Sequence, residues 1–399
     1  MSSAIDLPVW DLSGLYRGRD DPQIDHDLAE AARLLDSGLN YRQAVTLLAR
    51  IHAFGQLFDG GRGAGKLHQR VSAVALRSRV EDPPEPDNPP GIDAMCTAVA
   101  IKGAALWLAA HRPEPKSPGR RWTWAEAVET AVAAAASLSP EAGAAAEQTV
   151  REGRIHARHP GSPLSHPAGD RGPYVRLDFD GSLRSVMTLA HELGHAAHQM
   201  LSRPLGVLDC QPRAALAEVA ASVNEQAAFG LLLAEAQSAD AREVLLAYRR
   251  RDLAAVVLRH VALHRFEVVS AGRPSDAVWV RMVEQTCGLR AAREEKGSGW
   301  RAYPILSRAP GTAWTYAFAR LVAIALLSRR EADPEAFAAN WTTFLSQGGT
   351  VGEQPALWPF LLEPAAASFW SDAMELAVLE AEMSAEGWNR RLSLSRPWA

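Results

Sequence analysis

The sequence contains the motif His-Glu-x-x-His at residues 191–195. His191 and His195 are four residues apart, so on a helix both imidazoles lie on one face, about one turn apart. Two neutral imidazoles at that spacing can bind one Zn²⁺, each at about 2.0–2.1 Å. Glu192 is rotated by about 100° from His191 around the helix, so it does not bind the metal together with the two histidines but can reach a metal-bound water. The motif therefore predicts a zinc site with Glu192 as general base.

A catalytic zinc needs a third protein ligand and an open coordination position. Residues 214–226 have the pattern of a helix, on which Glu218 is an acidic residue on an otherwise apolar face. Burying a lone carboxylate is costly, and coordination to a cation removes that cost. Glu218 is therefore the candidate third ligand. Glu225 lies two turns further along nearly the same face, so it is a candidate for orienting a ligand imidazole.

Helical periodicity dominates the rest of the chain. Apolar residues recur at intervals of three and four, with few helix breakers, in residues 25–54, 122–152, 214–236, 239–271, 312–331, 334–346 and 366–387. The motif itself lies in a further such segment, 186–200. The best strand signal is 174–180, which alternates apolar and polar residues and ends at Gly181. The sequence therefore predicts a mainly α fold with a small β-sheet.

Local signals mark several boundaries. Thr123 with Glu126 predicts a capping box, and Ser139 followed by Pro140 predicts a second helix start. Residues 81–91 contain five prolines, which exclude a helix and predict an exposed linker.

Composition excludes several classes of function. The 399 residues carry 42 Lys and Arg against 46 Asp and Glu, a formal charge of −4 with no basic block. We therefore expect no binding to nucleic acid or to an anionic membrane. Three cysteines are too few and too scattered for a disulfide framework or a cysteine-based zinc site. The sequence begins without a signal-peptide pattern and has no uncharged apolar run of about 18 residues, so we expect a cytoplasmic protein.

Five blocks of the sequence resemble the oligopeptidase F branch of the M3 metallopeptidases, a thimet oligopeptidase-like family. The blocks occur in the family's order at residues 10–16, 122–128, 173–198, 217–225 and 344–350. The resemblance covers residues 8–36 and about 122–387. It implies a two-lobed helical zincin shell with a small β-sheet beside the H-E-x-x-H helix and a central channel. It also implies cleavage of short peptides, with one Zn²⁺ held by His191, His195 and Glu218 and with Glu192 as general base.

The sequence departs from that family in two places. The family's N-terminal region is far longer, so residues 1–121 are interpreted as a shortened N-terminal helical region and 122–399 as a helical catalytic region with the zinc site. The family also has an Ile-Pro-His stretch, whose histidine polarises the scissile carbonyl together with a tyrosine. Ile305 stands where that histidine is expected. In the tyrosine-rich pattern that follows, only Tyr316 keeps a hydroxyl, so Tyr316 is the candidate for this role.

The resemblance also implies that residues 174–180 form an edge strand, which pairs with an extended substrate through main-chain hydrogen bonds. Candidate substrate-binding residues are Tyr174, Arg176, Asp178, Gly181, His198 and Tyr303. For Arg176 a contact with a substrate carboxylate competes with simple solvation. His198 has two possible interpretations, a contact with substrate inside the pocket or a position at the rim of the pocket.

Other histidines fit weaker interpretations. His260 and His264 are four residues apart, which imitates the spacing of metal ligands, but no third ligand or base accompanies them. His156, His159 and His166 lie in or beside an irregular stretch before the strand, where a surface loop is the default interpretation.

Three functions fit these observations. The first is a zinc-dependent hydrolase that cleaves amide bonds of short peptides. The second is a zincin-fold enzyme recruited for a dedicated small-molecule reaction, such as amide hydrolysis, cyclisation or elimination in a biosynthetic pathway, which Ile305 and the shortened N-terminal region favour. The third is a non-catalytic peptide-binding protein. The substrate, the oligomeric state and the choice among Zn²⁺, Mn²⁺ and Co²⁺ stay open at this point.

Overall fold

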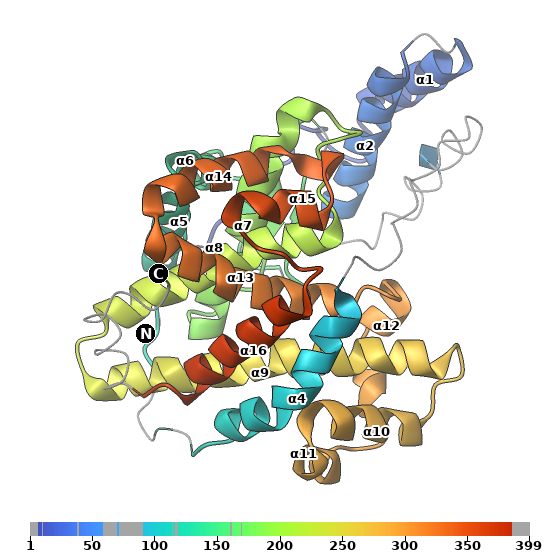
Figure 1. The fold of residues 1–399 in the computed structure, drawn as a ribbon. Helices are drawn as coiled ribbons and strands as arrows, with labels where there is room; N and C mark the ends of the chain where they lie inside the picture. The colour runs from blue at the N-terminus through green and yellow to red at the C-terminus, as the bar shows by residue number, and fades with distance from the viewer. Residues whose placement is uncertain are drawn as a thin grey trace, which may run out of the picture. The chain divides into compact units, whose positions relative to one another are not determined.

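Helices dominate the computed structural model of the chain, and its described part also contains a small three-stranded β-sheet (Figure 1). The prediction of a mainly α fold with a small sheet is therefore confirmed. The structure describes residues 7–9, 11–37, 40–58, 70–71, 91–113, 115, 119–159, 162–168 and 170–384. The predicted linker 81–91 lies outside these residues except for Gly91, and so does Trp10 of the first resembling block.

The chain divides into two compact units, which are described one at a time. Unit 1 consists of Met1–Pro86, Arg121–Arg213 and Ala338–Gly352, and unit 2 of Asp87–Arg120, Ala214–Phe337 and Glu353–Ala399. Each unit thus combines segments from both sides of residue 122. The division into 1–121 and 122–399, which follows the family resemblance, stays a prediction.

Unit 1 contains the sheet and the helix with the H-E-x-x-H motif. Its helices are α1 (Pro22–Ser37), α2 (Tyr41–Phe58), α5 (Trp124–Leu138), α6 (Pro140–Arg151), α7 (Leu183–Ser202) and most of α14 (Pro334–Ser346). Its strands are β1 (Ile155–His156), β2 (Leu164–His166) and β3 (Tyr174–Arg176). Short 3-10 turns cover Arg203–Leu205 and Gly348–Thr350.

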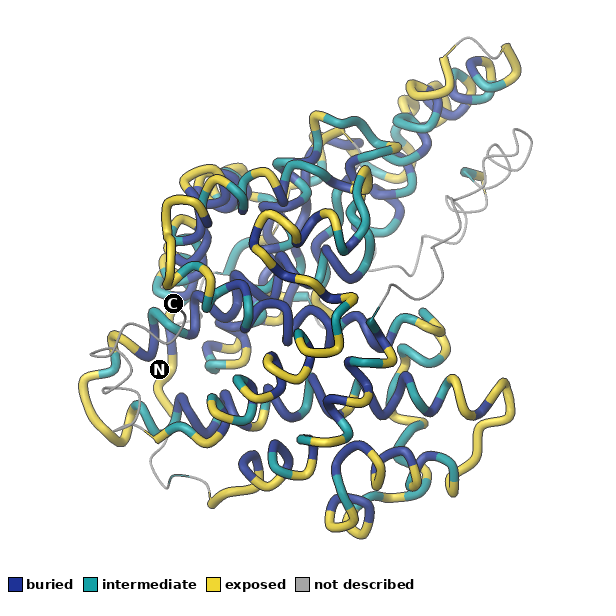
Figure 2. The backbone as a smooth tube through the Cα atoms, viewed as in Figure 1, coloured by how far each residue is buried: buried dark blue, intermediate teal, exposed yellow. Residues whose placement is uncertain are grey.

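Unit 2 is built from helices throughout its described part. Its longer helices are α4 (Ile92–Ala110), α8 (Ala214–Glu235), α9 (Ala239–Ser270), α10 (Asp276–Cys287), α13 (Trp314–Ala332) and α16 (Ala367–Glu382). Its shorter helices are α11 (Leu289–Glu294), α12 (Ile305–Arg308) and α15 (Glu353–Leu357), with 3-10 turns at Gly299–Ala302 and Trp358–Phe360. Figure 2 shows buried residues along these helices and exposed residues at the loops that join them.

Local capping signals set several helix boundaries. Thr123 and Glu126 form the predicted capping box at the start of α5. Ser139 caps α6 by accepting a hydrogen bond from the Ala142 N–H at 3.2 Å, and Pro140 occupies the first turn. The predicted helix 25–54 is interrupted and forms α1 and α2. The pattern alone did not predict this break.

The sheet of unit 1 has the strand order β1-β3-β2. β3 pairs in parallel with β1, where Val175 aligns with Ile155, and antiparallel with β2, where Val175 aligns with Ser165. The prediction that residues 174–180 form an edge strand is therefore wrong for residues 174–176, because both sides of β3 are already hydrogen-bonded. An alternating pattern shows that a segment is a strand, but it does not show how many neighbours that strand has.

Apolar packing holds each unit together. In unit 1, α7 packs against α5 and α6. Both partner helices are rich in alanine, and Gly143 of α6 lies where a Cβ would meet Ala136 of α5 at 2.6 Å. Because small residues let helix backbones approach closely, these two helices form a tight support for α7.

In unit 2, α13 packs against α8 and α9, and α4 packs against α9, α10 and α16 (Figure 1). Gly103 of α4 lies where a Cβ would collide with the Thr286 carbonyl, so glycine permits this close crossing. By length and composition α4 could cross a membrane, with a mean hydropathy of 1.5. Its contacts with three helices are those of a core helix of unit 2.

Candidate metal centre

Helix α7 positions the two histidines of the motif. Gly181, with φ of 78°, makes the turn into the helix, and Ser182 caps it by accepting a hydrogen bond from the Ser185 N–H at 3.2 Å. One apolar stripe of α7, including Leu189 and Leu193, is completely buried. Because this stripe is packed, the helix has a fixed rotation, and that rotation sets the direction of the histidine side chains.

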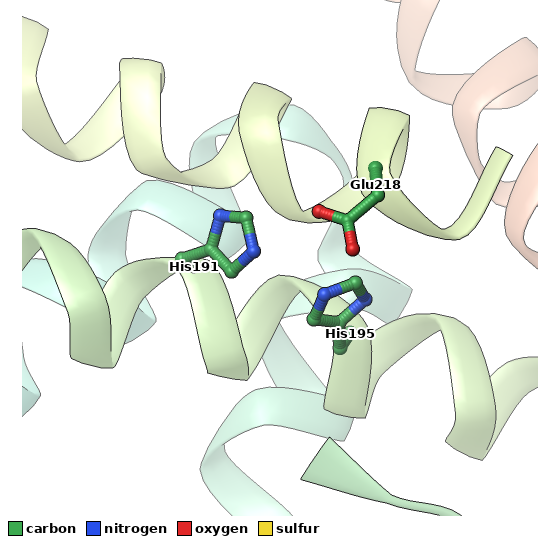
Figure 3. A group of neighbouring side chains, drawn as sticks. All are labelled: His191, His195 and Glu218. Atoms are coloured by element: carbon green, nitrogen blue, oxygen red, sulfur yellow. The ribbon is translucent and has the colours of Figure 1, made fainter. Parts of the chain in front are cut away.

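The rings of His191 and His195 are only partly buried, with their centroids 4.9 Å apart and their planes at 83°. Glu218 of α8 joins them: one potential ligand atom from each of the three residues lies within 4.8 Å of the others (Figure 3). Figure 3 shows the carboxylate directed toward the two imidazoles. In the described part of the chain, these three residues form the group of histidine, cysteine or acidic side chains that lies close enough together to hold a metal ion.

The donor set fits a divalent transition metal. Two imidazole nitrogens and one carboxylate oxygen are the protein ligands of a known class of catalytic zinc site, which leaves a coordination position open. Tetrahedral bonds of about 2.0–2.1 Å place ligand atoms roughly 3.4 Å apart. The potential ligand atoms found here lie within 4.8 Å of one another, so the residue types and their proximity fit such an ion.

Glu192 is 5% exposed, so the motif's carboxylate is in a dry environment. Arg176 of β3 is its electrostatic neighbour: burial lowers the pKa of the Arg176 guanidinium, and the Glu192 charge opposes that shift. Arg176 was predicted to meet a substrate carboxylate or solvent. The structure places it half-buried beside the motif.

Glu225 takes part in a buried ion-pair network in unit 2. The Nη2 atom of Arg320, on α13, donates to both Glu225 carboxylate oxygens at 3.1 and 3.0 Å. The Nη1 atom of Arg320 lies 3.1 Å from Asp252 of α9. Burial opposes the charge of Arg320, but Glu225 and Asp252 outweigh it and raise the pKa of the guanidinium. The described hydrogen bonds of Glu225 thus join α8 to α13, and its predicted role toward a ligand imidazole stays a prediction.

Sequence reasoning missed Arg320 and Asp252. A signal was present for Arg320, because it interrupts the apolar run Ala317-Phe-Ala-Arg-Leu-Val-Ala323. A buried arginine in such a run needs a carboxylate partner.

Tyr316, the predicted carbonyl-polarising residue, lies on α13 and contacts a histidine. Its ring centroid is 4.7 Å from that of His260 on α9, with the planes 30° apart. His260 Nδ1 lies 2.8 Å from the Val256 carbonyl oxygen. Burial lowers the pKa of His260 to about 4, so the imidazole is neutral at neutral pH. No second metal cluster forms around His260 and His264 among the residues that the structure describes.

Of the other candidates for substrate contact, Tyr174 and Gly181 make structural contacts within unit 1, whereas Asp178 is exposed. Tyr174 is 4% exposed and belongs to the apolar core around α1 and α2. The Gly181 carbonyl accepts the Trp122 N–H at 2.9 Å, so Gly181 joins two backbone segments of unit 1. Asp178 is exposed and forms an isolated bridge with Arg158.

His198 is 2% exposed, with its ring centroid 5.5 Å from that of Phe344. The expectation of a rim position is therefore wrong, since the apolar stripe of α7 carries His198 into the interior of unit 1. Burial, aided by His195, lowers the pKa of His198 to about 3. The surface-loop interpretation is also wrong for His166, which is partly buried in β2, and burial lowers its pKa to about 4.

Tyr303 lies in unit 2 beside a cavity of 590 Å³. The Arg259 guanidinium stands 5.3 Å from the centroid of its ring. Ile305, at the position of the expected histidine, is the first residue of α12.

The fold is helical, and its H-E-x-x-H helix and a later glutamate bring two imidazoles and a carboxylate together. These features define a class of proteins with a His₂Glu candidate metal site. The family model of peptidase family M3 matches residues 142–376, which is more than half of the chain and includes all three residues. The chain belongs to peptidase family M3, as the resemblance predicted. No curated protein matches it.

Several solved structures share the fold. A candidate peptidase from Chlamydophila abortus is 18% identical, with 93% of this chain and 66% of that chain covered and a TM-score of 0.57. PZ peptidase A with a bound inhibitor is 14% identical, with coverages of 92% and 78% and a TM-score of 0.61. Oligoendopeptidase F from Enterococcus faecium is 17% identical, with coverages of 91% and 66% and a TM-score of 0.51. The chain spans about two-thirds of the length of the first and third of these structures.

Proposed function

We propose that the protein is a metal-dependent hydrolase that cleaves amide bonds of short peptides in the cytoplasm, with one Zn²⁺. The observation that carries this proposal is the gathering of His191, His195 and Glu218 within 4.8 Å, next to a buried Glu192. Membership of peptidase family M3 supports it. The low net charge and the absence of a basic block give no reason to expect nucleic acid or membrane as a partner.

Each residue has a distinct task in this proposal. His191, His195 and Glu218 would hold the metal, which supplies Lewis-acid polarisation and a lowered pKa for water when bound. Glu192 accepts the proton of the attacking water and passes it to the leaving amine. Its low exposure strengthens its electrostatic interactions and keeps bulk water from competing for the proton.

Tyr316 is the proposed donor to the oxygen of the scissile carbonyl. The sequence has Ile305 where the family has a histidine, so one of two expected donors is missing. The loss of one such donor costs about 10²–10³ in rate. We therefore expect slower turnover than from a site with both donors.

A peptide library digested by the metal-loaded protein and read by mass spectrometry tests this function. We expect cleavage by the wild type and none by Glu192→Gln, with the same metal content in both proteins. Glu147→Gln, a change at an exposed glutamate of α6, is the matched control and should cleave as the wild type does. Cleavage by Glu192→Gln at the wild-type rate would refute the proposed mechanism.

Ile305 and the short N-terminal region favour a second candidate, a dedicated reaction on an amide-containing small molecule. It predicts wild-type protein that retains its metal yet cleaves no peptide of any length. Broad cleavage of the library excludes it. Peptide binding that persists without metal and without cleavage would instead support a peptide-binding protein.

A further inference from the structure

Two layers of polar residues connect helices α8, α9 and α13 inside unit 2. One layer is the network of Arg320 with Glu225 and Asp252, in which each helix contributes one residue. Along the chain, α8 and α9 are joined by a short loop, residues 236–238, and they run in opposite directions (Figure 1). The direction from Asp252 toward the C-terminal end of α9 is therefore the same in space as the direction from Glu225 toward the N-terminal end of α8.

The second layer lies about two turns from the first along α8 and α9, and one turn from it along α13. Glu218 is seven residues before Glu225, and His260 is eight residues after Asp252. The step of seven residues returns to within about 20° of the same helix face and the step of eight to within about 80°, and the two steps cover roughly 10–12 Å. Tyr316 is one turn before Arg320 on α13 and contacts His260 directly. His260 also experiences the charges of both Glu218 and Arg320, as this register requires. Glu218, His260 and Tyr316 thus form one layer.

The orientation of the His260 ring is fixed from within its own helix. The Val256 carbonyl is an acceptor, so the 2.8 Å contact requires that Nδ1 carry the hydrogen and donate it. A neutral imidazole with its hydrogen on Nδ1 has a lone pair on Nε2, and it therefore cannot donate to the oxygen of a carbonyl. The ring instead presents its face to the Tyr316 ring at 4.7 Å and 30°.

We propose that His260 is a positioning residue for Tyr316: its fixed imidazole face holds the phenol ring so that the hydroxyl is directed toward the carbonyl of a substrate bound next to Glu218. This inference rests on the proposed function. With Ile305 in place of a histidine, the orientation of the single remaining hydroxyl limits the stabilisation of the carbonyl oxygen. A misplacement of about 1 Å at such a group can cost about 10²-fold in rate.

The experiment is a double-mutant cycle with His260→Ala and Tyr316→Phe in the metal-loaded protein. Tyr316→Phe should lower kcat by about 10²–10³-fold. His260→Ala should lower kcat by about tenfold or more and leave KM and metal content unchanged. His260→Phe, which keeps a planar ring, should recover most of that loss. In the Tyr316→Phe background, His260→Ala should change kcat by less than about threefold, because the group that it positions is already absent.

A second readout does not depend on turnover. The affinity for a phosphinic peptide, whose oxygen mimics the charged oxygen of the reacting carbonyl, should fall in His260→Ala and in Tyr316→Phe to a similar degree. The affinity for an uncleaved amide peptide should not fall in either variant. His264→Ala is the matched control, because it removes a buried histidine one turn further along α9 and should leave kcat unchanged.

Any of three results would overturn the inference. The first is that the effects of His260→Ala and Tyr316→Phe on kcat multiply in the double variant. The second is loss of metal in His260→Ala, and the third is an unchanged affinity of His260→Ala for the phosphinic peptide. If the wild type cleaves no peptide, the proposed function fails instead. The two failures are therefore distinguishable.

Discussion

Arg320 binds Glu225 at two points, because one of its nitrogen atoms lies 3.1 and 3.0 Å from the two carboxylate oxygens. Both residues are almost completely buried. Because the pair is charged and buried, it ties α8 to α13 more strongly than a hydrogen bond between neutral groups would. Glu218 lies two turns away on nearly the same face of α8, so this ion pair helps to set the rotation of the helix face that carries Glu218.

Removal of Arg320 should be strongly destabilising. Arg320→Ala leaves Glu225 and Asp252 without their buried counter-ion, and we expect the free energy of unfolding to fall by about 3–5 kcal/mol. Urea denaturation followed by circular dichroism measures this change. Arg301→Ala breaks an ion pair with Asp276 in which both side chains are about half exposed, and it should cost less than about 1 kcal/mol. Similar losses in the two variants would contradict a buried charge network.

Metal binding should stabilise the fold. Two ligands come from α7 and one from α8, and an ion that binds only the folded protein at 100 times its Kd adds about 2.7 kcal/mol. We expect the Tm to rise when Zn²⁺ is added to chelator-treated protein. His191→Ala and Glu218→Gln should lose most of this rise. His111→Ala, at an exposed histidine beside α4, should keep it.

Acid should destabilise unit 1 through His166. The Nδ1 atom of His166 accepts the Ala168 N–H at 3.1 Å, and burial, with His52 and Arg176 nearby, lowers its pKa to about 4. The unfolded chain binds this proton near pH 6.5, so between about pH 6.5 and 4 it holds more protons than the folded chain. Stability contributed by His166 is therefore present above pH 6.5 and is lost as the pH falls toward 4.

The variant His166→Asn tests this prediction, because its Oδ1 can accept the same N–H but does not titrate. Urea midpoints measured from pH 7.5 to 4.5 should fall less in His166→Asn than in the wild type. His198 and His260 contribute losses of the same sign in both proteins. The difference between the two curves isolates His166, and parallel curves would disprove its role.

Gly181→Ala should destabilise unit 1 through the backbone. Gly181 has φ of 78°, and an added Cβ would lie 2.8 Å from the Trp122 carbonyl oxygen. We expect a loss of about 3 kcal/mol from the strained φ and the displaced carbonyl together. Gly153→Ala is the matched control, because its φ is 66° and nothing lies within 4 Å of the added Cβ, so only about 1 kcal/mol should be lost. Chemical denaturation of both variants measures the difference.

The sequence predicted the candidate site better than its surroundings. The spacing of His191 and His195 fixes a local geometry that any helix reproduces, and Glu218 stands out as an acid on an apolar face. These signals depend on only a few neighbouring residues. The same holds for the caps at Thr123 and Ser139, which the structure confirms.

Long-range pairing was harder to predict. The alternation in 174–180 does not show that β1 and β2 occupy both sides of β3, because each partner strand has only two or three residues. The contact between His260 and Tyr316 joins two helices far apart in the sequence, and neither residue type specifies the other. His198 was misjudged for a related reason, since its partner Phe344 is on α14.

The interleaving of the two units has a consequence for synthesis. On the ribosome, α7 emerges long before α14, which supplies Phe344 to cover His198. Unit 2 likewise needs α16, which packs on α4 and α13 near the end of the chain. Each unit therefore completes its core only late in translation. The helix that carries the two histidines can therefore pack on α5 and α6 as soon as it emerges, but His198 stays without its Phe344 cover until α14 has been made.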